Sequence, residues 1–317
     1  MLVRFQWLGL GMGAAGVVWL MWPGPQGDPK FDPRVFNPAY TVRQAKPMVL
    51  IDEAHANLDT AWGRYRPFAE LLRNDGYTVA VNRRKFEERA FAGARVLVVA
   101  DALGAGQRLL QAVRLEHKIH WPADAFDDEE TRAVREWVRG GGSLLLIAGR
   151  APYGEAAERL AARFAVEMSG GSVEDPAHHD PETGNPGFLL FSRDNGLLRE
   201  HAITRGRGED EELRQVLTFG GQVLRGPPGS AAFLKLSLRA IESPRLSLAG
   251  APSAWDDSQG LALEFGAGRV VMLAEDAMLT SLVEHRDKRE LHLGMSRQGY
   301  DNRQLTLNVI HWLTRIL

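Results

Sequence analysis

Two acids and a histidine stand together after an apolar run in the first quarter of the chain. Residues 48–51 are apolar, Asp52, Glu53 and His55 follow directly, and Asn57 comes two residues later. Carboxylates and imidazoles take up and release protons, so a group of this kind can act as a general acid and base. We therefore take Asp52, Glu53 and His55 as the candidate catalytic residues.

The letters D-E-A-H at residues 52–55 also occur in the second nucleotide motif of ATP-driven helicases. Such a motor needs a loop of the form G-x-x-x-x-G-K-[ST], whose backbone N–H groups and lysine hold phosphates. The chain contains no such loop, so the sequence predicts no nucleotide ligand. The formal net charge of −2 gives no electrostatic reason to expect nucleic acid as a partner.

Several other chemistries are excluded or unsupported by residue type. There is no cysteine in the 317 residues, which excludes disulfides, thiolate metal sites and a cysteine nucleophile. No G-x-S-x-G serine motif is present. The pairs His117/His120 and His178/His179 lack the spacing of H-E-x-x-H. The sequence thus predicts neither a metal site nor a cofactor.

Alternating strands and helices must position the candidate residues. Apolar runs predict strands, and apolar residues at helical spacing predict helices between them. The predicted strands are 47–52, 77–82, 94–103 and 143–149, and the predicted helices lie within 64–76, 127–139 and 152–165. This alternation predicts an α/β fold in which a mostly parallel, doubly wound sheet has helices on both faces.

The second half of the chain has a different pattern. Residues 169–187 are polar and rich in glycine and proline, which predicts a flexible loop. The segments 188–194, 214–224 and 231–237 then predict a β-rich insertion, and 260–276 predicts a hairpin that leads into a central strand. A final helix is expected from about residue 301 to the end.

The carboxyl ends of parallel strands meet at one edge of a sheet, where ligands bind in open α/β folds. Polar residues that follow predicted strands, or that open the last helix, are therefore the candidate ligand-binding residues: Asp52, Glu53, His55, Asn57, Asp101, Arg150, Glu275, Asp276 and Asn302. A structural ion-pair cluster is the alternative interpretation, because buried carboxylates need partners. Nearby arginines could provide them: Arg64, Arg66, Arg150 and Arg303.

The N-terminus contains an apolar stretch. Residues 5–22 carry no charge, and at 1.5 Å per residue they would extend roughly 27 Å, enough to cross a bilayer core. We predict a single-pass anchor over 1–25, a Pro/Gly-rich linker over 26–47 and one domain over 48–317. Arg4 would stay inside and place the domain on the extracytoplasmic (periplasmic) side of the cytoplasmic membrane. A cleaved signal peptide and a buried core helix are the alternatives.

Several segments taken together resemble a known family. They are VLIDEAHANLDTAWGRYRPFAELLRNDGYTV, VLVVADALG, REWVRGGGSLLLIAG and GRVVMLAEDAMLTS with DNRQLTLNVIHWL. They are similar to the class I glutamine amidotransferase-like fold, in particular to an uncharacterised membrane-anchored bacterial branch. The resemblance implies a flavodoxin-like sheet. It also places Gly149 and Arg150 at the turn where glutamine-hydrolysing members carry a cysteine, so glutamine hydrolysis by that route is excluded.

These observations predict a non-catalytic, membrane-anchored domain, a pseudoenzyme of the family. It would bind a small polar ligand or a protein partner in a transport or surface assembly outside the cytoplasmic membrane. The alternative is a hydrolase of another class that uses Asp52, Glu53 or His55 as acid or base, with or without a divalent metal. A third interpretation, a purely structural interaction domain, requires that the largest exposed apolar patch lie away from the strand ends.

Overall fold

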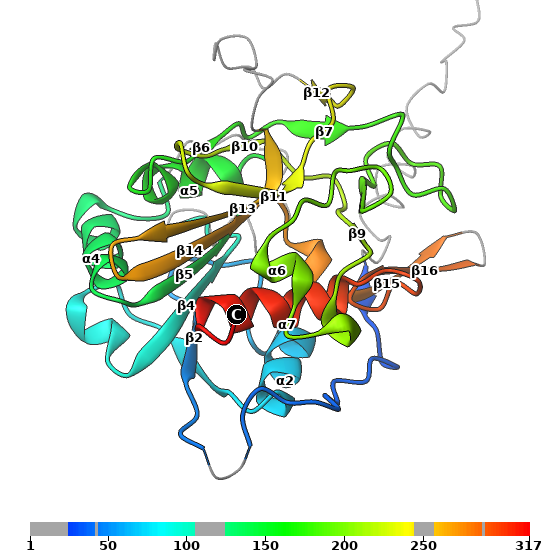
Figure 1. Cartoon of the computed structure of the whole chain (residues 1–317). Helices are drawn as coiled ribbons and strands as arrows, with labels where there is room; N and C mark the ends of the chain where they lie inside the picture. Colours follow the sequence, from blue (N-terminus) through cyan, green and yellow to red (C-terminus); the bar gives the residue numbers. More distant parts are fainter. Residues whose placement is uncertain (1–24, 42–43, 105–123, 244–256, 287–288) are drawn as a thin grey trace, which may run out of the picture.

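A nine-stranded mixed sheet forms the centre of the molecule (Figure 1). The computed structural model describes residues 25–41, 44–104, 124–243, 257–286 and 289–317. The strand order is β3-β2-β4-β5-β14-β13-β10-β6, and β11 pairs with β13. The strands are β2 Met48–Asp52, β3 Thr78–Asn82, β4 Ala94–Ala100, β5 Ser143–Ile147, β6 Glu167–Met168, β10 Leu224–Arg225, β11 Ala231–Lys235, β13 Ser258–Phe265 and β14 Gly268–Leu273.

One half of this sheet is parallel. The strands β3, β2, β4, β5 and β14 run in the same direction. Strand β2 comes first in the chain and lies between β3 and β4, so the parallel strands have the 2-1-3-4-5 order of flavodoxin-like folds. The direction of the connections reverses between β2 and β4. Ligands bind at this point in such folds, outside the carboxyl ends of the strands.

The other half of the sheet is antiparallel, which corrects the prediction of a mostly parallel sheet. The expected hairpin forms between β13 and β14, with Phe265 opposite Gly268. After this reversal, β10, β11 and β6 also pair antiparallel to their neighbours. The chain is therefore a mixed α/β protein with a large sheet. Part of the predicted β-rich insertion extends the main sheet instead of forming a separate unit.

Helices cover both faces of the sheet (Figure 1). Side chains alternate along a strand, so in β2 Val49 and Ile51 pack on one side and Leu50 on the other. The first side also contains apolar residues of α2 and α7, and the second those of α4 and α5. The helices are α2 Arg66–Asn74, α4 Asp128–Arg139, α5 Tyr153–Ala162, α6 Ala202–Arg205 and α7 Asn302–Leu313, with 3-10 turns η1 Glu88–Phe91, η3 Glu209–Glu211 and η4 Ala277–Leu279.

Local signals explain where α2 and α4 begin and end. Asp127 is the N-cap of α4 and forms a capping box with Glu130, which satisfies backbone N–H groups that the helix itself leaves free. The predicted apolar face of α4 is present, with Val134 and Val138 fully buried. After α2 the chain turns at Gly76 with φ of 96°, a conformation that favours glycine.

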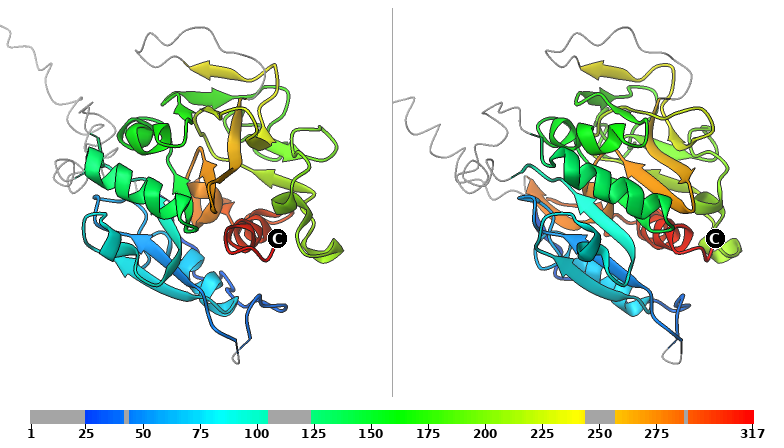
Figure 2. Two further views of the ribbon diagram at one scale, coloured as in Figure 1. Left: turned by 60° about the vertical axis from the view of Figure 1, so that its left-hand side comes forward. Right: turned by 90° about the vertical axis from the view of Figure 1, so that its left-hand side faces the viewer.

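Three smaller sheets surround this centre. Strand β1 (Gln26–Gly27) joins the hairpin of β15 (Ser281–Arg286) and β16 (Arg289–Gly294), which the sequence analysis did not predict. The ribbon of β7 (Ser172–Glu174) and β12 (Ile241–Ser243) lies at the far end of the molecule from β2 and β3 (Figure 2). Strands β8 (Leu190–Ser192) and β9 (Gln215–Leu217) form the third.

The segment predicted as a linker packs on the domain. Gly27 pairs with Leu282 of β15, and Phe31 and Tyr40 pack against the core. The segment predicted as a flexible loop contains β7 and the buried carboxylate of Asp180. Residues 1–24 of the predicted anchor (1–25) lie outside the described residues. Within the described residues no helix is both long enough and apolar enough to cross a membrane.

Candidate functional site

The loops that follow the parallel strands carry two groups of buried acids. Asp52 is the last residue of β2, the loop that follows contains His55 and Asp59, and Asp101 follows β4 directly. Asp276 comes three residues after the end of β14. Parallel strands present their carboxyl ends at one edge, so residues far apart in the chain meet there. The two groups differ in their chemistry.

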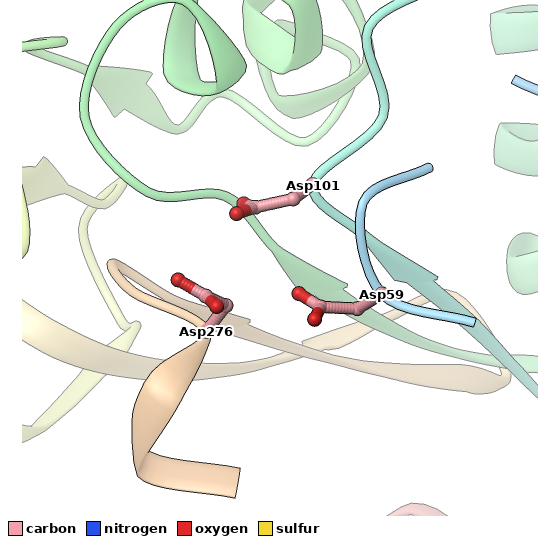
Figure 3. A group of neighbouring side chains, drawn as sticks. All are labelled: Asp59, Asp101 and Asp276. Carbon is pink, nitrogen blue, oxygen red and sulfur yellow. The ribbon is translucent and has the colours of Figure 1, made fainter. Parts of the chain in front are cut away.

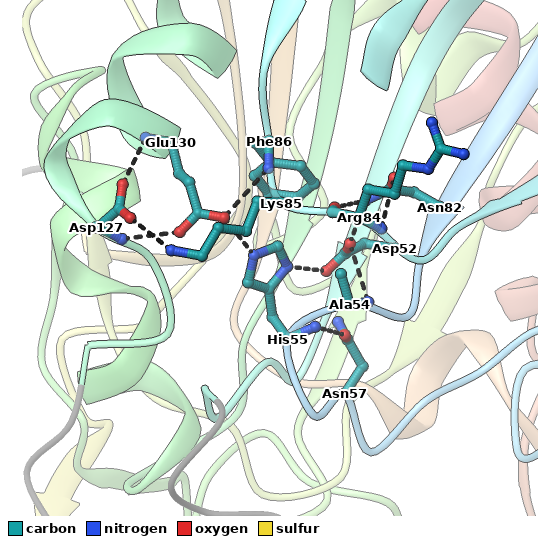
Figure 4. Close-up of polar contacts among 10 residues, drawn as sticks. All are labelled: Asp52, Ala54, His55, Asn57, Asn82, Arg84, Lys85, Phe86, Asp127 and Glu130. Carbon is teal, nitrogen blue, oxygen red and sulfur yellow. Dashed lines mark hydrogen bonds and ion pairs between the residues drawn. The ribbon is translucent and has the colours of Figure 1, made fainter. Parts of the chain in front are cut away.

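The first group, which we call the histidine cluster, consists of Asp52, His55 and Glu130 (Figure 4). The Nδ1 atom of His55 lies 2.7 Å from Asp52 Oδ2, and its Nε2 atom lies 2.9 Å from Glu130 Oε1. All three residues are buried. The rings of Phe86 and Phe126 lie 4.5 and 4.7 Å from the imidazole ring. The histidine is therefore held between two carboxylates and two aromatic rings.

This environment favours the charged form of His55. Burial alone would favour the neutral ring, but the hydrogen bonds and charges of Asp52 and Glu130 outweigh it and raise the pKa of His55. Both ring nitrogens are committed to carboxylates, so neither can accept a proton from a substrate. The cluster ties the loop after β2 to the first turn of α4. This geometry gives His55 a structural role and offers no support for it as a general base.

The acids of the histidine cluster also have further bonds. Asp52 Oδ1 accepts a hydrogen bond from Asn82 at 2.9 Å. Glu130 accepts backbone N–H groups of Phe86 and Asp127, each at 3.1 Å. Hydrogen bonds of this kind offset the cost of burying a carboxylate. Asp52 thus belongs to a network of hydrogen bonds and ion pairs, which agrees with the alternative interpretation of these residues as a structural ion-pair cluster.

Four other predicted ligand residues are bonded within the fold. The Glu53 carboxylate accepts the N–H of Ala61 at 2.9 Å and pairs with Arg83 at 3.3 Å. The Asn57 amide group bridges the N–H of His55 and the carbonyl of Ala100. The Glu275 carboxylate accepts the backbone N–H groups of Ala277 and Met278. The Asn302 amide group bonds to the backbone of Leu217 and Met278. These four side chains hold loops in place.

Arg150 follows a strand, as expected, but it does not join the buried acids. It follows β5 in the turn before α5 and is exposed. Arg64, and not Arg150, makes the ion pairs with Asp59 and Asp276. Of the histidine pairs, His117 and His120 lie outside the described residues, and His178 Nδ1 contacts Asp175 Oδ2 at 2.9 Å.

The second group, which we call the carboxylate cluster, consists of Asp59, Asp101 and Asp276 (Figure 3). One oxygen of each carboxylate lies within 4.8 Å of the others. Asp59 and Asp101 are 0% and 1% exposed, and the side chain of Asp276 is 17% exposed. Arg64 pairs with two of them, with Nη2 2.6 Å from Asp276 Oδ2 and Nη1 3.3 Å from Asp59 Oδ1.

The backbone fixes Asp101 within this cluster. Its φ angle is 42°, a left-handed conformation that aspartate adopts more readily than most residues. Its carbonyl accepts the N–H of Leu58, and its own N–H donates to the carbonyl of Ile147. The Oδ1 atom accepts the N–H of Gly149 at 2.8 Å. Three strand-end segments are thus joined at this residue.

The carboxylate cluster holds more negative charge than its arginine can neutralise. Burial, together with the nearby charge of Asp276, raises the pKa of Asp59 to about 8, although Arg64 acts in the opposite direction. Burial and the charges of Asp276 and Asp59 raise the pKa of Asp101 well above its ordinary value. The pKa of Arg64 is also raised, because the acids outweigh the effect of its burial. Such perturbed carboxyls in a strand-end site are typical of functional positions.

One oxygen in the cluster lacks a partner. Asp59 Oδ2 is buried and receives no hydrogen bond from an N–H group of the described residues, and the Asp59 carboxyl can bond to the neighbouring Asp276 only when one of the two acids is protonated. Asp59 Oδ1 has only the ion pair with Arg64. Buried polar atoms are nearly always hydrogen-bonded, so Asp59 differs from Asp52 in the same loop. The cluster is the part of the strand-end edge with capacity to bind something else.

A hollow of about 730 Å³ adjoins the cluster. Arg64, which contacts two of the acids, lines it together with Trp62, Arg66 and Glu70. Trp62 is 69% exposed. Volumes of this size are common for sites that take small molecules.

Two members of these clusters were missed at the sequence level. Asp59 lies in the loop that begins at Asp52, so its position at a strand end could have been inferred from the loop alone. Glu130 could not, because it lies 75 residues from His55 and its spacing to Asp127 indicates only a helix cap.

Comparison with known proteins gives the fold but no family. No family model and no curated protein matches the chain. It is similar to the solved mmIFT52 N-terminal domain, with a TM-score of 0.57 and 13% identity over 84% of this chain and 97% of that one. Weaker likenesses include a cytoplasmic protein of Salmonella typhimurium LT2, with a TM-score of 0.46 and 16% identity over 84% and 99% of the two chains. Another is a ThuA-like protein of Bacteroides uniformis, with a TM-score of 0.43 and 12% identity over 87% and 94%.

These findings correct the family assignment. The resemblance to a membrane-anchored bacterial branch of the amidotransferase-like family is wrong as an identification, because no family model supports it. A substantial fold likeness is to the mmIFT52 N-terminal domain instead. The segments that resemble the family consist of strands whose ends are followed by acids and helices. This pattern recurs across unrelated α/β proteins.

Proposed function

We propose that this chain is a non-catalytic binding domain that takes a small polar ligand at the carboxylate cluster and the adjoining hollow. The observation that carries the proposal is the unpartnered carboxylate oxygen of Asp59, buried beside Asp101 and Asp276 at the strand-end edge. A buried acid without a partner destabilises a fold. A ligand that provides the missing hydrogen bonds or charge would recover that free energy.

The hollow supports a ligand of modest size. Arg64, Arg66, Glu70 and Asp28 contribute polar groups to its lining, and Trp62 contributes an exposed aromatic face. Small-molecule sites combine a few polar groups with aromatic surface in this way. Arg64 lines the hollow and also pairs with two acids of the cluster, so a ligand in the hollow would be coupled to the acids through Arg64.

The alternative function, hydrolysis with Asp52, Glu53 or His55 as acid or base, has weaker support. Both nitrogens of His55 contact carboxylates, and Glu53 is bonded to Ala61 and Arg83. The predicted membrane location, and a protein partner in a transport or surface assembly, stay predictions because the predicted anchor lies outside the described residues.

The test is a thermal-shift measurement on the full chain in EDTA with neutral sugars, amino acids and short diamines as probes. We expect at least one probe class to raise the melting temperature of the wild type and of Phe36→Ala, but not of Trp62→Ala. Phe36 is the matched control, because it is also an exposed aromatic but does not line this hollow. No shift with any class, or equal shifts in both variants, would contradict the proposal.

A further inference from the structure

The oxygens of the carboxylate cluster lie close enough together for one hard cation to contact all three acids. Calcium binds oxygens at about 2.3–2.6 Å, so ligands on opposite sides of the ion lie up to roughly 5 Å apart. Magnesium binds at about 2.0–2.1 Å, which limits that separation to roughly 4.2 Å. The three acids offer oxygens within 4.8 Å of one another. This upper limit of 4.8 Å admits calcium without movement of the side chains, whereas magnesium requires every separation to be below roughly 4.2 Å.

Each of the three acids has one carboxylate oxygen available to coordinate a cation. Gly149 occupies Asp101 Oδ1, and Arg64 occupies Asp276 Oδ2 and contacts Asp59 Oδ1. Among the described residues no N–H group and no ion pair reaches the second oxygen of any of these three carboxylates. Asp59 is the decisive residue, because its carboxylate is fully buried and points toward Asp101 and Asp276 (Figure 3).

The net charge of the carboxylate cluster also favours a divalent cation. Three ionised aspartates and Arg64 sum to a net charge of −2 within the cluster. A single divalent cation balances this charge, and without one the acids must take up protons instead. The neighbouring Glu275 does not compete for the site, because its two oxygens accept the N–H groups of Ala277 and Met278.

We propose that Asp59, Asp101 and Asp276 bind one divalent cation of about the size of calcium. The donor set contains only carboxylate oxygens, with neither histidine nor cysteine, which suits hard cations and not zinc or copper. The partly exposed Asp276 leaves a side for water or for oxygens of an organic ligand to complete the coordination. This inference rests on the proposed function, since it names the cation as part of what the site binds.

The test is calorimetric titration of the EDTA-treated, dialysed full chain with calcium chloride and, separately, with magnesium chloride. We expect one calcium site, weaker magnesium binding, and at least tenfold weaker calcium binding in Asp59→Asn. Asp194→Asn, an exposed aspartate elsewhere, should bind calcium like the wild type. Asp276→Asn is a second variant whose partial exposure makes misfolding a lesser concern, and it should lose binding as Asp59→Asn does.

Other results would overturn the inference. Calcium binding that survives in both Asp59→Asn and Asp276→Asn would mean that the cation binds elsewhere. No calcium binding, together with an organic probe that still shifts the melting temperature in EDTA, would overturn the cation while leaving the proposed function intact. Neither calcium nor any organic probe binding would overturn both.

Discussion

The histidine cluster and the carboxylate cluster begin in the same loop but differ in whether their acids have partners. Asp52 bonds to His55 and to Asn82, whereas four residues after His55 the buried Asp59 has an oxygen with no hydrogen-bond partner among the described residues. The first cluster contains His55, whose charged form is favoured by Asp52 and Glu130. The second lacks enough positive charge for three acids. The difference shows that burial of an acid does not by itself indicate a binding site. Whether the acid already has hydrogen-bond or ion-pair partners decides whether it can bind a ligand.

The largest expected effect comes from removing the cation of the histidine cluster. His55→Leu leaves Asp52 and Glu130 buried without it, and breaking a buried ion pair in this way costs about 3–5 kcal/mol. Urea unfolding of the wild type and variant would measure the loss. His292→Leu is the control, because His292 pairs with Asp28 at a more exposed site. A loss below about 1 kcal/mol for His55→Leu would show that the cluster is not the structural element we describe.

The next effect compares the two aspartates directly. Asp52→Asn should lower the free energy of unfolding by about 1–3 kcal/mol, because it disturbs a satisfied hydrogen-bond network. Asp59→Asn should leave it unchanged or raise it in cation-free buffer, because it removes one of three mutually repelling acids. Equilibrium unfolding of both variants in EDTA checks this. Equal losses would remove the distinction between the clusters.

The pH dependence of His55 sharpens the comparison further. Its folded pKa is raised above 6.5 by Asp52 and Glu130 against the effect of burial, so its contribution to stability is complete below about pH 6.5. Between about pH 6.5 and the folded pKa, the folded chain binds a proton that the unfolded chain has released. The free energy of unfolding therefore falls as the pH rises, and the contribution is lost above the folded pKa.

NMR titration of the imidazole signals would measure this directly. His201 is an internal control, because burial and the charges of Arg205 and Arg269 lower its pKa to about 4. We expect a charged His55 and a neutral His201 at pH 7. A neutral His55 at that pH would be inconsistent with an imidazolium between the two carboxylates.

The smallest effect concerns the helix that supplies Glu130. Asp127→Ala removes the N-cap of α4 and should cost about 1 kcal/mol. Glu129→Ala, also exposed and in the first helical turn, makes no capping bond and should cost less. Thermal unfolding of both variants measures the difference. An Asp127→Ala loss as large as that of His55→Leu would mean that the cap, and not the ion pairs, holds the cluster together.

The sequence predicted much of the local structure. Apolar runs located β2, β3, β4 and β5, and the pattern between residues 260 and 276 predicted the β13–β14 hairpin. The predicted helix within 127–139 begins at Asp127, which is the N-cap of α4. These features depend on residues that are close in the chain, such as the side chain that bonds to the third backbone N–H of its own helix.

Other features depended on distant residues and were missed. The β15–β16 hairpin has no strong turn signal, and the antiparallel half of the sheet follows from which strand lies beside β13. The hydrogen bond between His55 and Glu130 spans 75 positions. Pattern and spacing carry no information about such pairs.

The sequence by itself determined that acids would follow the parallel strands and that no cysteine chemistry could occur there. Only the tertiary structure decided which acids received partners. Strand order placed His55 and Glu130 against Asp52, and gathered Asp101 and Asp276 around Asp59 with a single arginine. The physical reason is that the pKa and the binding capacity of a carboxyl depend on its burial and on the charges within a few ångströms, and these are set by residues far apart in the chain.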